Sequence, residues 1–216
     1  MRVAKRYSQR EALGYAYTSL IGFSNQPKAS ELERWARAAL DALGPGHRWL
    51  PALAHNLAMQ WMDAGFFGPA LVVFLRLPAD FIRLEAQLGL AANTARAAAA
   101  VGDAANYRAA RARAEALLDN PAARYAAVVS LINLARAGVL AGEWDHAEAT
   151  AERAVRLATE LSQSQDLMSA EALVESIRAD RRVGASARQP RADPAPPDVA
   201  RLAVDVSAAL ATSGPG

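Results

Sequence analysis

The three histidines, His47, His55 and His146, are the side chains best suited by type to hold a metal or move a proton. They are scattered along the chain and lack the paired spacing that zinc ligands need. The chain contains no cysteine. It also lacks a glycine-rich phosphate loop followed by lysine and serine or threonine. The sequence therefore predicts no catalytic activity, no metal site and no cofactor.

A more informative pattern is an asparagine nine residues before a glycine. It occurs three times, as Asn56 with Gly65, Asn93 with Gly102 and Asn133 with Gly142. An asparagine amide both donates and accepts hydrogen bonds, so it suits contact with the backbone of a bound peptide. The same amide can instead stabilise neighbouring helices. Both interpretations stay open at the level of sequence.

The neighbours of these asparagines indicate what they could help to bind. Met59, Arg96 and Arg136 follow the three asparagines at the i+3 position, and His55 precedes the first. A surface built from these residues is partly apolar and weakly positive.

Composition limits the fold class. Of 216 residues, 53 are alanine, 52% are hydrophobic and the formal net charge is +2. Alanine is the best helix former and is depleted in strands, so an all-α fold is expected. The basic excess lies at the two ends of the chain and not in one stripe, so no nucleic-acid partner is predicted. No stretch reaches 18 uncharged apolar residues, which predicts no membrane segment. The apolar run Leu13–Phe23 is diluted by polar residues and no small-residue cleavage site follows it, so a signal peptide is not expected and a cytoplasmic location is predicted.

Turn and cap residues divide the chain into about eight helices in antiparallel pairs. Capping boxes are expected at Ser8 with Glu11 and at Ser30 with Glu33. Asn120, followed by a proline, is expected to cap another helix. The glycine of each repeated pattern is expected to adopt the left-handed conformation that ends a helix. Arg108, Arg111 and Arg113 are expected on a solvated outer face.

Two segments carry an aromatic residue soon after the turn glycine and then an alanine three residues later. These segments are Leu131–Leu157, with Trp144 and Ala147, and Ala54–Leu77, with Phe67 and Ala70. Both resemble the tetratricopeptide repeat family, and Leu90–Leu118 resembles a degenerate repeat. The resemblance implies a right-handed α-α superhelix of three to four hairpins, in which the first helix of each hairpin lines a concave groove. It implies a protein-interaction module with the asparagines on the groove side. A groove of this partly apolar and weakly positive kind would suit an acidic segment or a C-terminal segment of a partner protein.

The C-terminal part follows a different pattern. Asp166–Arg182 is expected to form a helix that caps the repeats. We expect a repeat domain over residues 1–183, a linker rich in proline, alanine and arginine over 184–198, and a short helix with a tail over 199–216. Val199, Leu202, Val206 and Leu210 form one apolar stripe, which predicts that residues 199–211 dock within the molecule, in the groove.

Two functions are consistent with these patterns. The first is a non-catalytic module that binds a peptide or partner protein in the groove. In a bacterial regulatory setting it would act through that partner, because no DNA-binding helix-turn-helix is recognisable. The alternative is an all-helical small-molecule sensor or enzyme. Its pocket would lie between helical turns, near the aromatic residues Trp49, Trp61, Phe66 and Phe67.

Overall fold

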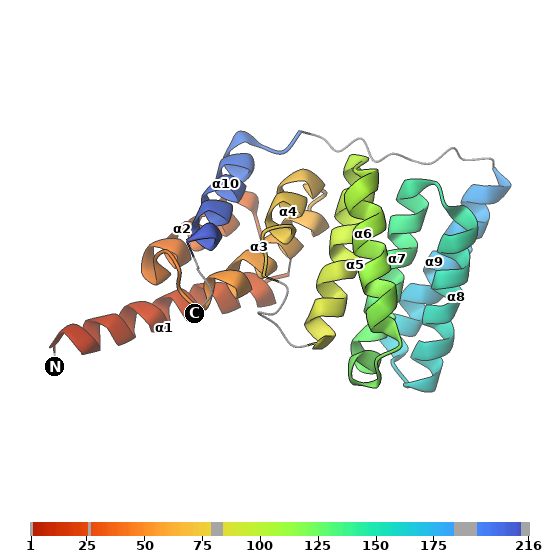
Figure 1. Cartoon of the computed structure of the whole chain (residues 1–216), viewed down its shortest axis with the longest axis horizontal. Coiled ribbons are helices and arrows are strands. Elements are labelled where there is room, and N and C mark those ends of the chain that lie inside the picture. The colour runs from red at the N-terminus through yellow and green to blue at the C-terminus, as the bar shows by residue number, and fades with distance from the viewer. Residues whose placement is uncertain (1, 26, 79–83, 184–193, 213–216) are drawn as a thin grey trace. The chain divides into compact units, whose positions relative to one another are not determined.

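The computed structural model describes residues 2–25, 27–78, 84–183 and 194–212, and the side chains from residue 8 onward. Across these ranges the chain is helical and contains no β-strand (Figure 1). The all-α fold class is therefore confirmed. Contacts divide the chain into two compact units, one formed by residues 1–81 with 193–216 and the other by residues 82–192. We call them the N-terminal and the C-terminal unit.

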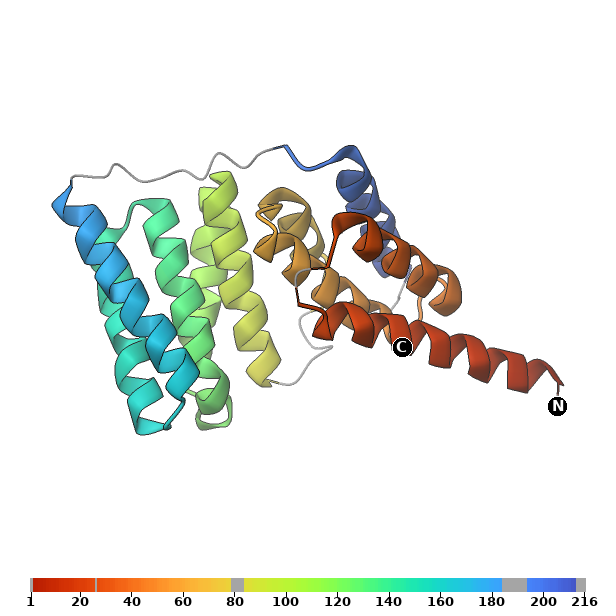
Figure 2. The same ribbon diagram turned by 180° about the vertical axis from the view of Figure 1, so that it is seen from behind.

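The N-terminal unit contains two helical pairs and a returning helix. The pairs are α1 (Arg2–Phe23) with α2 (Ala29–Leu43) and α3 (Leu50–Asp63) with α4 (Phe67–Phe74). Helix α10 (Pro197–Ala211) packs against α4, α2 and α3. The same neighbours lie beside it in both views (Figures 1 and 2). The N-terminal unit is thus discontinuous in sequence, because its last helix follows the whole C-terminal unit.

The apolar stripe of the C-terminal segment explains this packing. Val199, Leu202, Val206 and Leu210 are all buried, and Leu202 retains only 1% of its accessible surface. Arg37 on α2 forms an ion pair with Asp205 on α10 at 3.3 Å. The expected helix over residues 199–211 is confirmed. Its main neighbours, α4 and α2, are the second helices of their pairs, whereas a groove position would require the first helices. Of the expected linker, residues 184–193 lie outside the described residues.

The C-terminal unit contains two further pairs and a final helix. The pairs are α5 (Leu84–Val101) with α6 (Ala104–Leu118) and α7 (Ala127–Ala141) with α8 (Trp144–Glu160). A short 3-10 helix, η1 (Pro121–Ala126), precedes α7. Helix α9 (Ser164–Arg182) packs on α8 and α7, and α5 packs along α7. The expected cap at Asn120 is confirmed, since its side chain accepts a hydrogen bond from Ala122 N.

The repeated glycines form the turns of three pairs. Gly65, Gly102 and Gly142 all have positive φ, at 84°, 78° and 77°. In each turn the residue after the glycine donates its backbone N–H to the carbonyl five residues before it, at 2.7, 2.9 and 2.8 Å. This bond closes the helix end and satisfies a carbonyl that would otherwise lack a partner. The predicted left-handed turns are confirmed.

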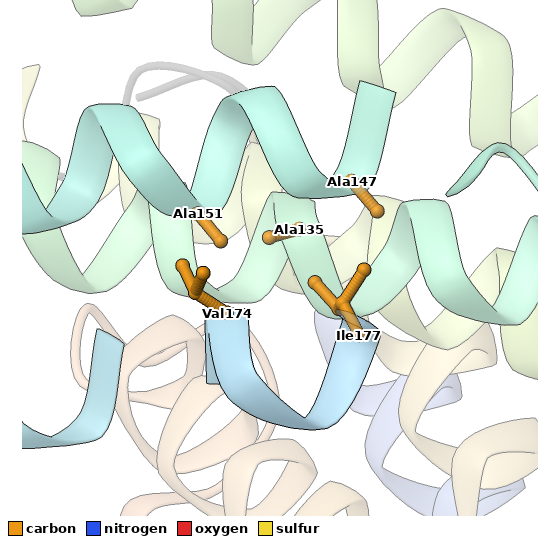
Figure 3. Close-up of a cluster of buried hydrophobic side chains, with 5 residues drawn as sticks. All are labelled: Ala135, Ala147, Ala151, Val174 and Ile177. Carbon is orange, nitrogen blue, oxygen red and sulfur yellow. The ribbon is translucent and has the colours of Figure 1, made fainter. Parts of the chain in front are cut away.

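Alanine allows the helices of the C-terminal unit to approach closely. Ala135, Ala147 and Ala151 pack with Val174 and Ile177, so that α7, α8 and α9 meet around small side chains (Figure 3). At Gly138 a Cβ atom would lie 3.1 Å from Ala147 Cβ, so only glycine fits there without a shift. Ala58, Ala70, Ala95 and Ala154 are fully buried as well. Part of the high alanine content is therefore architectural.

Two expected helix starts are wrong. Helix α2 begins at Ala29, where Glu31 accepts a hydrogen bond from Lys28 N at 3.3 Å, so Ser30 and Glu33 lie inside the helix. Ser8 and Glu11 lie within α1, which runs from Arg2. A capping pattern is short and occurs by chance, and tertiary contacts decide where a helix begins.

One stretch in the described residues, Pro121–Ala141, has the length and mean hydropathy (1.2) of a membrane span. Of its most apolar window, 61% is buried inside the structure. The core helix of a folded domain has the same properties, so the stretch gives little support for a membrane segment.

Candidate functional site

The candidate residues divide between the two units. His55, Asn56 and Met59 lie on α3, in the N-terminal unit. The other four lie on α5 and α7 in the C-terminal unit, where Asn93, Arg96 and Asn133 are in contact and Arg136 lies one turn further along α7.

Asn133 is the centre of the second group. Its Nδ2 donates to Asn93 Oδ1 at 2.9 Å, and its Oδ1 accepts from Arg96 Nη1 at 3.3 Å. Asn93 and Asn133 are 4% and 7% exposed. A buried amide loses its water, so these hydrogen bonds compensate for the loss and fix α5 against α7. The structural interpretation of the asparagines accounts for both residues.

Asn56 has a similar role in the other unit. Its Nδ2 donates to the Thr18 carbonyl at 3.1 Å, which ties α3 to α1. A Cβ atom on Gly22 would lie 2.5 Å from that same Nδ2, so α1 approaches the amide closely. The neighbouring His55 ring lies 6.2 Å from the Phe74 ring, centroid to centroid. Burial lowers the pKa of His55, and a side-chain hydrogen bond with Asn56 opposes that shift.

The two arginines differ in their surroundings. Arg96 Nη1 donates to Asn133 Oδ1, so this guanidinium contacts α7. Arg136 is half-buried and forms no ion pair with any residue in the described ranges. Val129 lies seven residues before Arg136, two turns away on the same face of α7, and is 48% exposed. This face therefore presents an apolar side chain and a guanidinium in one line.

A second polar cluster, between α6 and α8, was not expected from the sequence. Tyr107 Oη donates to Glu143 Oε2 at 2.9 Å, and Arg111 Nη1 donates to the same carboxylate oxygen. Arg111 Nε also donates to Glu115 Oε1 at 3.0 Å. Burial raises the pKa of Tyr107, and burial together with the charge of Arg111 lowers the pKa of His146. Arg111 is thus the centre of an ion-pair network and is half-buried, whereas Arg108 and Arg113 are exposed as expected.

The N-terminal unit contains a cavity of about 560 Å³. Trp61 and Phe66 line it, whereas Trp49 and Phe67, the other two aromatic residues of the alternative prediction, do not. Leu202 of α10 contributes a wall. The end of α1, the start of α2 and the end of α3 supply the rest.

Groups of three or more acidic, histidine or cysteine side chains able to hold a metal ion are absent from the described part of the chain. Comparison with protein-family models, with curated proteins and with solved structures finds no match for this chain.

Proposed function

We propose that the chain is a degenerate tetratricopeptide-like protein, a right-handed α-α superhelix without catalytic activity. Its C-terminal unit would bind an acidic segment of a partner protein along α5 and α7. The repeated glycine turns, the paired helices and the buried alanines support the repeat architecture.

The unneutralised guanidinium of Arg136 is the observation that carries the binding proposal. Guanidinium groups bind carboxylates through two parallel hydrogen bonds and are favoured at interfaces for that reason. Asn133, one turn before Arg136 on α7, binds Arg96 of the neighbouring helix α5. In this arrangement the arginines contact the partner, and the asparagines support them from behind.

The spacing along α7 defines the segment further. Val129 and Arg136 are seven residues apart, which corresponds to about 10 Å along the helix axis. An extended peptide covers that distance in about three residues. The preferred ligand therefore carries an apolar side chain and a carboxylate three residues apart.

Peptide binding to charge-reversed variants tests this proposal. Extended peptides with a leucine and an aspartate three residues apart are compared with counterparts in which asparagine replaces the aspartate. We expect the wild type to prefer the aspartate peptide, and Arg136→Glu to weaken its binding by at least about tenfold, as expected for a charge-assisted hydrogen-bonded pair. Fluorescence anisotropy measures both affinities.

Arg156→Glu is the matched control, since Arg156 is exposed on α8 and forms no ion pair with a described residue. It makes the same change in net charge away from the α5/α7 face. Equal affinity of the wild type for the aspartate and asparagine peptides, or equal losses in the two variants, would contradict the proposal.

A further inference from the structure

The cavity of the N-terminal unit has the size of a small-molecule site. Its volume of about 560 Å³ lies within the range of about 300–1,000 Å³ that is usual for organic ligands. Its residues come from both ends of the sequence, since Ser24, Leu32 and Trp61 face Val199 and Leu202 of α10. The cavity is thus complete only when α10 is docked.

Hydrogen bonds from Gln60 to two backbone carbonyls hold the polar edge of the cavity in place. Gln60 Nε2 donates to the carbonyls of Ile21 and Ser24, both at 3.0 Å. These two bonds hold the end of α1 against α3 and keep Ser24 at the cavity wall.

The charge of the cavity has one sign. Glu33 and Asp63 line it, and no lysine or arginine does among the described residues. Glu33 is paired with Arg37 at 2.9 Å. Asp63 is exposed and has no ion-pair partner in the ranges that the structure describes. An unpaired carboxylate at the edge of a cavity that is part apolar attracts a cation.

The aromatic wall suits the body of such a cation. Trp61 is 1% exposed, and its indole N–H donates no hydrogen bond to another described residue. Trp61 and Phe66 both line the cavity. Tryptophan is the aromatic side chain that attracts organic cations best.

We propose that this cavity binds a small organic cation with an apolar body, an amine of about the size of a phenylalkylamine. Asp63 would pair with the ammonium group, while Trp61 and Phe66 would contact the apolar part and α10 would close the site. The proposal concerns the N-terminal unit and is independent of peptide binding by the C-terminal unit.

Isothermal titration calorimetry with phenethylamine and 3-phenylpropionate tests the proposal on the full-length chain. The two probes share an apolar body and differ in charge. We expect saturable binding of the amine, and at least about fivefold weaker binding of the carboxylate, because one pairing of charges contributes about 1 kcal/mol. Absence of saturable amine binding, or equal affinity for both probes, overturns the proposal.

Asp63→Asn and Asp41→Asn locate the bound amine. Asp41 is exposed on α2, does not line the cavity and has no ion-pair partner among the described residues. We expect Asp63→Asn to weaken phenethylamine binding about fivefold and Asp41→Asn to leave it unchanged. Equal effects of the two substitutions would place the amine elsewhere and overturn the proposal.

Hydrogen exchange supplies a second readout that does not depend on a substitution. Because α10 forms a wall, an amine in the cavity favours the docked helix, and amides of residues 199–210 should exchange more slowly when phenethylamine is present. Unchanged exchange in α10 at saturating amine would contradict the proposed site.

Discussion

Asn133 joins two helices through one amide, because its nitrogen donates to Asn93 and its oxygen accepts from Arg96. A single residue thus orders a buried polar pair and a guanidinium at the surface. Removing it leaves Asn93 Oδ1 without this donor in a buried position. Loss of a hydrogen bond to a buried group costs more folding free energy than the average net contribution of a hydrogen bond. This larger cost sets the effect of such a substitution on stability.

We expect Asn133→Ala to lower the free energy of unfolding by about 1–3 kcal/mol. The double variant Asn93→Ala/Asn133→Ala should lose less than the sum of the two single losses, because both partners of the bond are then absent. Urea denaturation measures all three variants. Additive losses would show that the amide pair is not an energetic unit.

Ser162 has the position of the turn glycines but retains a side chain. Its φ is 56°, and Gln163 N donates to Ala158 O at 2.9 Å, as in the three glycine turns. Left-handed backbone costs a non-glycine residue about 1–2 kcal/mol. Ser162→Gly should therefore stabilise the C-terminal unit by about 1 kcal/mol.

Gly102→Ala is the converse substitution. A Cβ atom there meets nothing within 4 Å, so its cost of about 1 kcal/mol would be conformational and not steric. Thermal denaturation should show Tm rising in Ser162→Gly and falling in Gly102→Ala. A change of the same sign in both variants would argue against the conformational explanation.

His55 links stability to pH. Its pKa is lowered from the ordinary value of 6.5 in the folded chain, chiefly by burial, so the unfolded chain binds the proton more readily. The folded state therefore loses no stability from this residue above pH 6.5. Below pH 6.5 the loss of folding stability grows as the pH falls toward the folded pKa. The slope is at most about 1.4 kcal/mol per pH unit for one proton. We expect His55→Gln to reduce the loss of stability between pH 7 and pH 5.

His146 contributes to that loss with the same sign, since burial and Arg111 lower its pKa too. The stability of His55→Gln therefore still falls with pH, but less steeply than that of the wild type. Urea denaturation at several pH values measures the two slopes. Identical pH profiles of stability in the variant and the wild type would show that His55 does not contribute to the loss of stability at low pH.

At the scale of elements, α6 and α8 are joined by polar side chains, whereas α7, α8 and α9 meet through alanine. Tyr107 is 3% exposed and reaches Glu143 at the start of α8, and Arg111 binds the same carboxylate. The Arg111 guanidinium carbon also lies 5.9 Å from the centroid of the Tyr107 ring. This network fixes one helix pair against the next.

Tyr107→Phe keeps the ring and removes the hydroxyl. We expect a loss of about 1 kcal/mol in the free energy of unfolding, the usual net contribution of one hydrogen bond. Tyr125→Phe is the control, because Tyr125 is 75% exposed and should lose almost nothing. Equal effects on the urea midpoint would mean that the hydroxyl of Tyr107 does not join the two helices.

The sequence predicts those features of the helices that depend only on residues close together in the chain. A glycine required for positive φ and an apolar stripe on a short helix are both visible in the residues themselves, as at Gly102 and Leu202. The place of Arg111 is not local, since its charge is balanced by Glu143, which lies 32 residues further along the chain. The cavity was also beyond prediction in detail. The sequence indicated Trp61 and Phe66, but the α10 wall depends on a tertiary contact.

At the scale of the molecule, the two units differ in whether they are continuous in the sequence. The C-terminal unit is one continuous segment, whereas the N-terminal unit is formed from both ends of the chain. The described contacts of α10 are with helices of the N-terminal unit. A change in α10 should therefore affect one unit and spare the other.

We expect Leu202→Ala to destabilise the N-terminal unit by about 2–5 kcal/mol, the range found for buried leucines. Residue-resolved hydrogen exchange should show faster exchange in α2, α3 and α4 and unchanged exchange in α7 and α8. Val204→Ala is the control, because Val204 lies on the exposed side of α10. Faster exchange throughout the chain would show that the units unfold together.

The position of α10 also has a consequence for biosynthesis. A ribosome makes α1 to α4 first, then the entire C-terminal unit, and only then the residues that cover Trp61. Nascent domains usually fold in the order of their synthesis, yet here the earlier unit must wait for the later one. During translation the C-terminal unit can fold first, and the apolar surface beneath α10 remains open to chaperones until residues 199–210 have emerged.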